Sequence, residues 1–331
     1  MNPWDVQIDF WNVGQGDAST IVFPDKKLVV IDVGPFNSSI SRWFANQNKP
    51  CRIEHLILTH NDADHVGGLE AIVNAKNVTI GTAYMLHDCH PRDEIKKRVR
   101  LLSKKASHIK RLECENGGIK SIINIDNYSL EFRYPSPKDN FLTASNNETS
   151  GIIVLSYNGV DCISWGADNT LQTMTQHIAS NVAMQFGPHH GAPQDSKAKI
   201  PSALQKLNPQ RCYISVGTKN RHKHPAPKFL KSLCHIGCFP MCSQVTKHCS
   251  EELYLKNTSI YNSCAQYALP PPGSSAISCW GHVRFYLRAG MFELDYVSQQ
   301  VSKKIRELSC STACCAIYKN NTINAGDNLN K

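Results

Sequence analysis

The feature that most constrains this chain is a group of four potential metal ligands within six residues, directly after an apolar strand predicted for residues 53–59. The ligands are His60, Asp62, Asp64 and His65, and the pair Gly67-Gly68 follows them. Imidazole and carboxylate groups on one short strand-to-helix turn can bind two close cations, which hold an oxyanion and lower the pKa of water. Taken alone, the same residues also fit a solvated acidic turn that caps a helix over 69–75, because aspartate is a good N-cap.

Residues that can bind a metal also follow three later predicted strands. Asp168 follows a strand over 160–165, the pair His189-His190 follows one over 182–186, and His224 lies in the loop after one over 211–216. Each of these alone is typical of a turn or surface residue. Because strand C-termini at one edge of a sheet converge in space, the four strand ends together predict one shared site.

The hydrophobic pattern predicts a mixed α/β fold. Strands are expected at 6–11, 18–23, 27–33, 53–59, 128–134, 151–157, 160–165, 182–186, 211–216, 279–287 and 291–297, and helices at 39–46, 69–75, 92–111, 171–180 and 226–233. No internal repeat is present. One αββα domain over 1–298, with a cysteine-rich insertion at about 234–279, fits this order better than two domains do, and 299–331 is expected to be a helix followed by a loose tail.

The net charge of +9 favours polyanionic partners such as nucleic acid, although a solvated basic surface without a partner fits the charge equally well. The segment 92–111 has nine Lys/Arg residues against two acidic ones. A second basic group lies around the loop that contains His224, and its members are Lys219, Arg221, Lys223, Lys228 and Lys231. Either group is a candidate contact for a phosphate backbone, with a solvated helix face as the alternative for the first.

No run of 18 uncharged apolar residues and no secretory signal is recognised, so a cytoplasmic location without a membrane span is expected. In that compartment the 14 cysteines favour metal ligation over disulfides. A structural zinc is one interpretation, with Cys242, Cys249, Cys264 and Cys279 as its ligands. The alternatives are disulfides, or a buried helical face, since Cys234, Cys238 and Cys242 recur every four residues.

The motif His60-x-Asp62-x-Asp64-His65-x-Gly67-Gly68 resembles the metal loop of the metallo-β-lactamase superfamily, whose usual form has histidine at the position of Asp62. The aspartate form is similar to the hydrolase domain of ComEC-type DNA-uptake proteins and their soluble relatives. The resemblance covers about residues 6–230, and a fainter one continues through Cys279-Trp280-Gly281. Its other motifs are Asn12-Val13-Gly14-Gln15-Gly16-Asp17-Ala18, Gly166-Ala167-Asp168, His189-His190-Gly191, Ser215-Val216-Gly217 and His224-Pro225.

The resemblance implies a four-layer αββα sandwich and a site for two metal ions. It assigns His60 and Asp62 to one ion, Asp64 and His65 to the other, and Asp168 to both. His190 would complete one coordination sphere, and His189 would be a ligand or an orienting neighbour. Asp17 and Asp32 would support the ligands from behind, while His224 would face the substrate as a ligand or a proton donor.

This chain departs from the family pattern at three places. Ala192 stands where serine is common, and His222-Lys223 replaces the usual Tyr-Gly, so the roles of His222 and His224 stay open. The middle histidine ligand of ordinary members has no clear counterpart, and the region 147–150 is a candidate for its place.

The resulting hypothesis is a metal-dependent phosphodiesterase or nuclease, in which Asp64 orients the attacking water and His224 protonates the leaving oxygen. Zinc is the first choice of metal because of the imidazoles, and manganese is the alternative because of the carboxylates. Two other classes remain open. One is a hydrolase of small esters, thioesters or lactams, and the other is a nucleic-acid-binding or partner-docking module, in which the cysteine-rich insertion contacts a protein partner or a second copy and hydrolysis is secondary.

Overall fold

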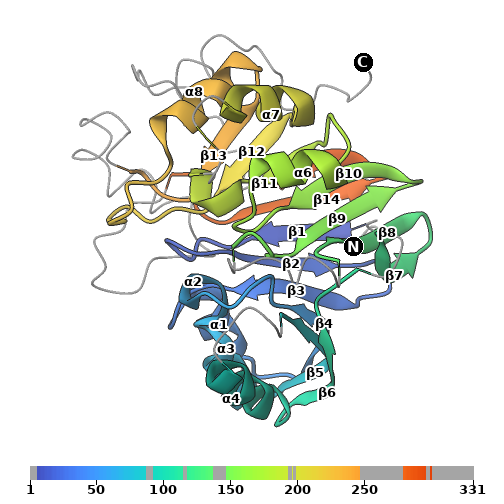
Figure 1. Cartoon of the computed structure of the whole chain (residues 1–331). Coiled ribbons are helices and arrows are strands. Elements are labelled where there is room, and N and C mark those ends of the chain that lie inside the picture. Colours follow the sequence, from blue (N-terminus) through green and yellow to red (C-terminus); the bar gives the residue numbers. More distant parts are fainter. Residues whose placement is uncertain are drawn as a thin grey trace.

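The computed structural model describes residues 6–86, 92–114, 118–136, 147–192, 199–246 and 279–295, together with residues 196 and 299. These residues form two β-sheets that pack face to face, with helices on the outer face of each (Figure 1). Helices therefore lie outside both sheets, and the predicted αββα arrangement is confirmed. Among the residues described, no helix is long and apolar enough to cross a bilayer.

The first sheet contains eight strands in the order β15-β14-β1-β2-β3-β4-β5-β6. Antiparallel pairs join β14, β1, β2 and β3, whereas β3 to β6 pair in parallel. The strands are β1 (Val6–Phe10), β2 (Ala18–Val22), β3 (Leu28–Val33), β4 (Cys51–Ile57), β5 (Val78–Met85), β6 (Ala106–Arg111), β14 (Val283–Arg288) and β15 (Met291–Leu294). The first described strand, β1, thus lies next to β14, the second-last one, in one sheet.

The second sheet contains seven strands in the order β13-β12-β11-β10-β9-β8-β7. Its members β7 to β10 form an antiparallel meander, and β10 to β13 are parallel. The strands are β7 (Lys120–Ile125), β8 (Tyr128–Tyr134), β9 (Ile152–Tyr157), β10 (Val160–Trp165), β11 (Met184–Phe186), β12 (Arg211–Ile214) and β13 (Phe239–Cys242).

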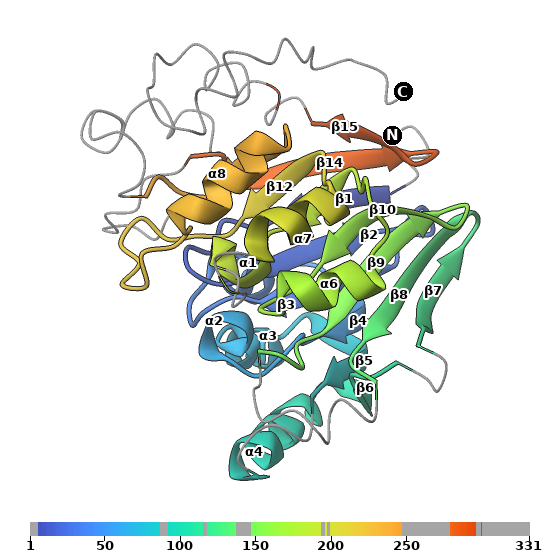
Figure 2. The ribbon, with the colours of Figure 1, turned by 45° about the horizontal axis from the view of Figure 1, so that its top comes forward.

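The helices divide between the two outer faces (Figure 2). On the first sheet lie α1 (Ser39–Ala45), α2 (Ala63–Val66), α3 (Leu69–Asn74) and α4 (Arg92–Leu102), and on the second lie α6 (Leu171–His177), α7 (Lys199–Leu207) and α8 (Pro227–His235). A short 3₁₀ helix, η1 (Pro188–Gly191), follows β11. Each helical layer packs on its sheet through a separate apolar cluster.

The central core lies between the sheets and is rich in aromatic side chains. Phe10 of β1 contacts Phe186 of β11 and Tyr213 of β12, each with ring centroids 5.0 Å apart, and Phe285 of β14 at 5.2 Å. These rings come from both sheets. Burial of their apolar surface away from water therefore holds the two sheets together.

Two local predictions were wrong. The segment 92–111 is not one helix, since α4 ends at Leu102 and the chain continues as the edge strand β6, whose backbone pairs with β5. The spacing of Cys234, Cys238 and Cys242 is not a helical face either, because α8 ends at His235 and Cys242 lies in β13. The domain boundaries stay predictions, and most of the insertion and nearly all of the tail lie outside the described residues.

Candidate metal centre

The predicted ligands meet at one end of the sandwich, where strand ends of both sheets come together. His60 and His65 follow β4 of the first sheet, and Asp62 is the N-cap of α2. Asp168 follows β10 and His190 lies in η1 after β11, both in the second sheet. The expectation of a single sheet edge was therefore wrong, because two facing sheets supply the side chains.

The carboxylate of Asp168 lies in the middle of four imidazoles. Its Oδ2 atom is 3.6 Å from His60 Nε2 and 3.6 Å from His189 Nε2. Its Oδ1 atom is 3.3 Å from His65 Nε2 and 3.7 Å from His190 Nε2. One carboxylate therefore faces two pairs of imidazoles with its two oxygens.

The two other aspartates of the loop add one carboxylate to each pair. Asp62 Oδ2 lies 3.8 Å from His60 Nε2, and Asp64 Oδ2 lies 3.1 Å from His190 Nε2. The arrangement thus has two sets that share Asp168. One set is His60, Asp62 and His189, and the other is His65, Asp64 and His190.

Groups behind the imidazoles determine which ring nitrogen faces the centre. His65 Nδ1 donates to Asp32 Oδ2 at 2.8 Å, and the Thr59 hydroxyl donates to the same carboxylate at 2.6 Å. That hydroxyl oxygen is also 3.1 Å from His60 Nδ1 and can accept a hydrogen bond from it. With Nδ1 of each ring engaged from behind, Nε2 is left for a metal ion.

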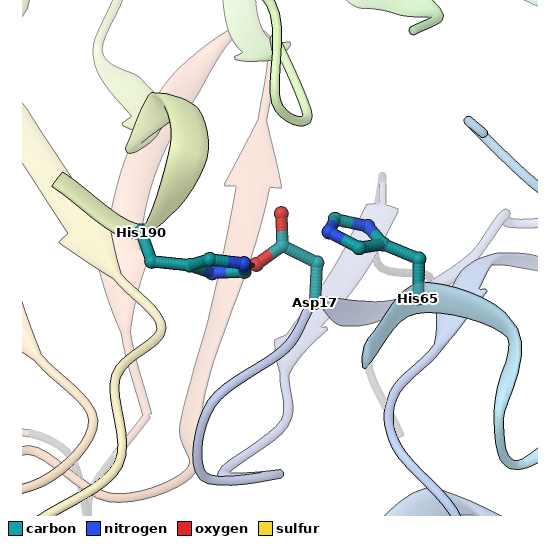
Figure 3. Close-up of side chains that lie close together, drawn as sticks. All are labelled: Asp17, His65 and His190. Atoms are coloured by element: carbon teal, nitrogen blue, oxygen red, sulfur yellow. Dashed lines mark ion pairs between the residues drawn. The ribbon is translucent and has the colours of Figure 1, made fainter. Parts of the chain in front are cut away.

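Asp17 lies behind His190 as a buried counter-charge. Its Oδ1 atom lies 3.1 Å from His190 Nδ1, and Figure 3 shows its side chain between His190 and His65. The backbone of the same residue donates to the Asp64 carbonyl at 3.2 Å, so the loop after β1 is tied to the metal loop. Asp17 also forms a close group with His65 and His190 that could itself hold an ion.

The charges of this buried cluster balance one another. Burial by itself raises the pKa of Asp168, but the imidazoles of His65 and His190 outweigh it and hold this pKa well below its ordinary value. Burial by itself lowers the pKa of His190, yet Asp17 and Asp168 raise it to about 10. The pKa of His65 is raised well above its ordinary value, against burial, by Asp168 and Asp32. Without a metal, these two imidazoles therefore carry protons at neutral pH.

Five atoms of the cluster have no hydrogen-bond partner although they are buried. Asp17 Oδ1 and His190 Nδ1 lie 3.1 Å apart, and the other three are His60 Nε2, His65 Nε2 and Asp168 Oδ1. Buried polar atoms are normally satisfied, because leaving one unpaired costs free energy. A cation between the last three atoms would satisfy them, and the group His60, His65 and Asp168 is spaced closely enough to hold one. The donor set of imidazole and carboxylate suits zinc or manganese.

The loop 217–225 brings His224 to the margin of the centre. Its ring centroid is 5.6 Å from that of His189 and 6.3 Å from that of His190, and the ring of His222 stacks on it at 5.6 Å. The amide of Asn220 holds the backbone of His224, accepting from its N–H at 2.7 Å and donating to its carbonyl at 3.0 Å. Burial, with the charges of His190 and His189, lowers the pKa of His224 to about 4.

Sequence reasoning missed three residues that shape the centre. Thr59 connects His60 with Asp32, and its position directly before the motif was the available signal. Arg98 of α4 donates to the Asn61 carbonyl of the metal loop at 2.7 Å, and only its place in a basic segment pointed to it. Asn169 donates to the Ser150 carbonyl at 2.9 Å, which places the region 147–150 beside Asp168.

The second predicted site is only partly covered by the described residues. Cys249 and Cys264 lie outside them. The chain near Cys242 is hydrogen-bonded to the chain near Cys279, because Trp280 N donates to Cys242 O at 2.9 Å and Cys279 N to Ser243 O at 3.0 Å. The structural zinc at these four cysteines stays a prediction.

Comparisons with known proteins show what the chain is similar to. Residues 11–134 match the family model of the metallo-beta-lactamase superfamily. ComE operon protein 3 of Bacillus subtilis (strain 168) is 24% identical over 253 residues, which cover 69% of this chain and 30% of that protein. The chain thus spans less than a third of the length of this relative.

Solved structures with a similar fold include the metallo-beta-lactamase fold protein YhfI from Bacillus subtilis, with 11% identity and a TM-score of 0.46, covering 72% of this chain and 95% of that one. Another is the short form of human tRNase Z, with 10% identity and a TM-score of 0.44, covering 63% and 92% of the two chains. Likeness at this level identifies no substrate for the present chain.

Proposed function

We propose that this chain, which resembles the metallo-β-lactamase superfamily and ComE operon protein 3, is a metal-dependent phosphodiesterase that cleaves nucleic acid. The observation that carries the proposal is the Asp168 carboxylate, whose two oxygens face separate pairs of imidazoles at 3.3–3.7 Å. A shared carboxylate between two nitrogen-rich sets is the arrangement that a pair of hydrolytic metal ions requires.

Seven side chains would hold the ions: His60, Asp62, His189, His65, Asp64, His190 and Asp168. Two divalent ions, when bound, polarise a phosphoryl oxygen and lower the pKa of water. The protein contributes orientation, since Asp32, Thr59 and Asp17 fix the imidazoles from behind. Asp64 would also orient the attacking water, because its side chain is one-third exposed while those of its neighbours His65 and His190 are buried.

His224 is the proposed proton donor to the leaving oxygen. Its pKa of about 4 means that the imidazole is neutral at pH 7 in the protein alone. A bound phosphate anion favours the protonated form of a nearby imidazole, so the substrate itself would supply the conditions for protonation. The contacts of Asn220 keep His224 close to His189 for this step.

Charge near the centre supports a polyanionic substrate. The guanidinium of Arg98 contacts the metal loop, and the rest of α4 and the edge strand β6 continue the basic surface beside it. Most Lys/Arg side chains there are exposed: Lys96, Lys97, Arg100, Lys104, Lys110 and Arg111. With a net charge of +9, such a surface binds phosphates and releases their counterions.

The test is hydrolysis by protein that has been stripped of metal and reloaded with zinc or manganese. Single- and double-stranded oligonucleotides are compared with small ester, thioester and lactam substrates. We expect oligonucleotide cleavage only after reloading, and we expect Asp168→Asn to lose both activity and bound metal. Asp126→Asn, the same change in an exposed turn, serves as the control.

Two results would contradict the proposal. Hydrolysis of the small substrates without cleavage of any oligonucleotide would identify a small-molecule hydrolase. Full activity of Asp168→Asn would place the reaction elsewhere in the chain. Metal content and circular dichroism, measured on the same samples, separate loss of the ions from loss of the fold.

A further inference from the structure

Phe36 is the most exposed of the large apolar side chains in the described part of the chain, with 80% of its surface accessible. It follows β3 in the turn that leads to α1. Single exposed apolar residues are common on proteins and need no explanation by themselves. Phe36 differs from the other exposed apolar residues because its turn is hydrogen-bonded to segments of the metal centre.

The turn is fastened on both sides to the segments that build the metal centre. Gly34 N donates to the Asp17 carbonyl at 2.9 Å, and Gly68 N donates to the Gly34 carbonyl at 3.0 Å. Inside the turn, Ser38 N donates to Pro35 O at 3.1 Å and Ser38 Oγ to Val33 O at 2.7 Å. The backbone that presents Phe36 is therefore held in place, and only its ring is left to solvent.

Two glycines allow this close approach. A Cβ atom on Gly67 would lie 2.5 Å from Phe36 N, and one on Gly16 would lie 2.8 Å from Pro35 Cδ. Real Cβ atoms do not tolerate such distances, so any other residue at either place would push the turn away from the metal loop. The backbone of an exposed aromatic residue is thus packed against Gly67, two residues after His65.

We propose that Phe36 is a stacking platform for a nucleobase next to the scissile phosphate, which gives the centre a preference for single-stranded nucleic acid. This inference rests on the proposed function. Every base presents a π-face, so an aromatic ring beside a phosphate-binding site recognises polynucleotide without reading its sequence. In a duplex the base faces are covered by their neighbours, and only an unstacked base can lie on Phe36.

The test measures binding separately from catalysis. Anisotropy of a labelled single-stranded oligonucleotide is followed with the full-length, metal-stripped protein and with three variants, Phe36→Ala, Phe36→Leu and Phe36→Trp. Stacking on one aromatic ring corresponds to roughly 5- to 150-fold in affinity. We expect Ala and Leu to weaken binding by this factor and Trp to retain it. The salt dependence should not change, because no charge is removed.

Two controls make the result specific. Val160→Ala removes a 67% exposed side chain at the start of β10, at the opposite end of that strand from Asp168, and should leave binding unchanged. An oligonucleotide of the same length with abasic positions at its centre keeps the phosphates and loses the bases. On that ligand, wild type and Phe36→Ala should bind equally.

The inference is overturned if Phe36→Ala binds the normal oligonucleotide as tightly as wild type, or if it loses as much affinity on the abasic one. If wild type cleaves oligonucleotides and Phe36→Ala binds them as tightly as wild type, only the role of Phe36 is refuted and the proposed function stands. A wild-type protein that neither binds nor cleaves any oligonucleotide would refute the proposed function, and this inference with it.

Discussion

Contacts on the outer side of each imidazole decide how well the centre of this protein can hold a metal ion. Asp32 is buried and accepts from both His65 Nδ1 and the Thr59 hydroxyl. Through Thr59 it also reaches His60, so one carboxylate orients one imidazole of each set. Its backbone φ of 54° is unfavourable for a residue other than glycine, a cost that this arrangement offsets.

Asp32→Asn should therefore weaken metal binding without removing any ligand. Loss of such an outer partner typically costs ~10- to 100-fold in metal affinity, and we expect a reduction of that size. Competition with a chromogenic chelator measures the affinity for zinc. The control is Asp126→Asn, at an exposed turn. An unchanged zinc affinity in Asp32→Asn would show that the outer carboxylate does not orient the ligands.

Metal uptake should also release protons. His65 and His190 have raised pKa values, that of His190 being about 10, so both are protonated at pH 7.5 in the metal-free protein. A metal ion binds only the neutral imidazole, and each displaced proton makes affinity rise about tenfold per pH unit below the raised pKa. Calorimetry in buffers of different ionisation enthalpy counts the protons. Zinc binding without proton release at pH 7.5 would contradict these pKa values.

At the scale of single residues, the sequence predicted the candidate metal ligands where they are adjacent in the chain. Four of them lie between His60 and His65, and the others directly follow strands. Thr59, Arg98 and Asn169 were not foreseen, because their importance comes from contacts with residues that are distant in the chain or from a role that only the folded geometry reveals.

Among the secondary-structure elements, α4 has a direct connection to the metal loop. Arg98 is half-buried, and its guanidinium donates to Asn61 O at 2.7 Å. Burial lowers the pKa of Arg98 from its ordinary value, partly opposed by the charges of Glu94 and Asp62. An arginine tolerates this environment because its guanidinium remains charged at all relevant pH values. The contact places the basic surface of α4 beside His60 and Asp62.

Arg98→Ala should lower kcat/KM for an oligonucleotide by about 10-fold or more, because it removes both a positive charge and a charged hydrogen bond of roughly 1.5–3 kcal/mol. Arg100→Ala, at an exposed position of the same helix, removes the charge alone. It should raise KM and reduce the salt dependence with little effect on kcat. Equal kinetic effects of the two changes would mean that Arg98 acts only through its charge.

The same region shows why the element pattern was harder to predict than the site. Beyond Leu102 the sequence is basic and has no clear alternation, and a continued helix was the expectation. The edge strand β6 forms because β5 offers it backbone partners from Ile80 to Met85. That support is tertiary, and local propensity does not report it.

On the scale of the whole molecule, the two ends of the described chain are joined in one sheet. β1 pairs with β14, and the buried Asp9 of β1 accepts from Arg284 Nε at 2.7 Å and lies 2.8 Å from His282 Nε2. The hydrophobic pattern predicted both strands, but a sequence pattern does not tell which strands are neighbours.

Asp9→Ala should destabilise the protein by about 3–5 kcal/mol, because Arg284 and His282 would lose their buried counter-charge. Burial by itself raises the pKa of Asp9, but the contacts with His282 and Arg284 outweigh it, and this pKa lies below its ordinary value of 3.8. A lowered pKa stabilises the fold above the unfolded value and loses that contribution as the pH falls through the folded value.

The difference in unfolding free energy between wild type and Asp9→Ala should therefore be full at pH 7 and shrink below about pH 3.8. Urea unfolding of metal-stripped protein at pH 7 and pH 3 measures it without interference from the centre. Asp126→Asn should match wild type at both pH values, since that side chain is exposed. A difference that stays constant with pH would mean that Asp9 stabilises β1 and β14 by packing, and that its charge does not join these two strands.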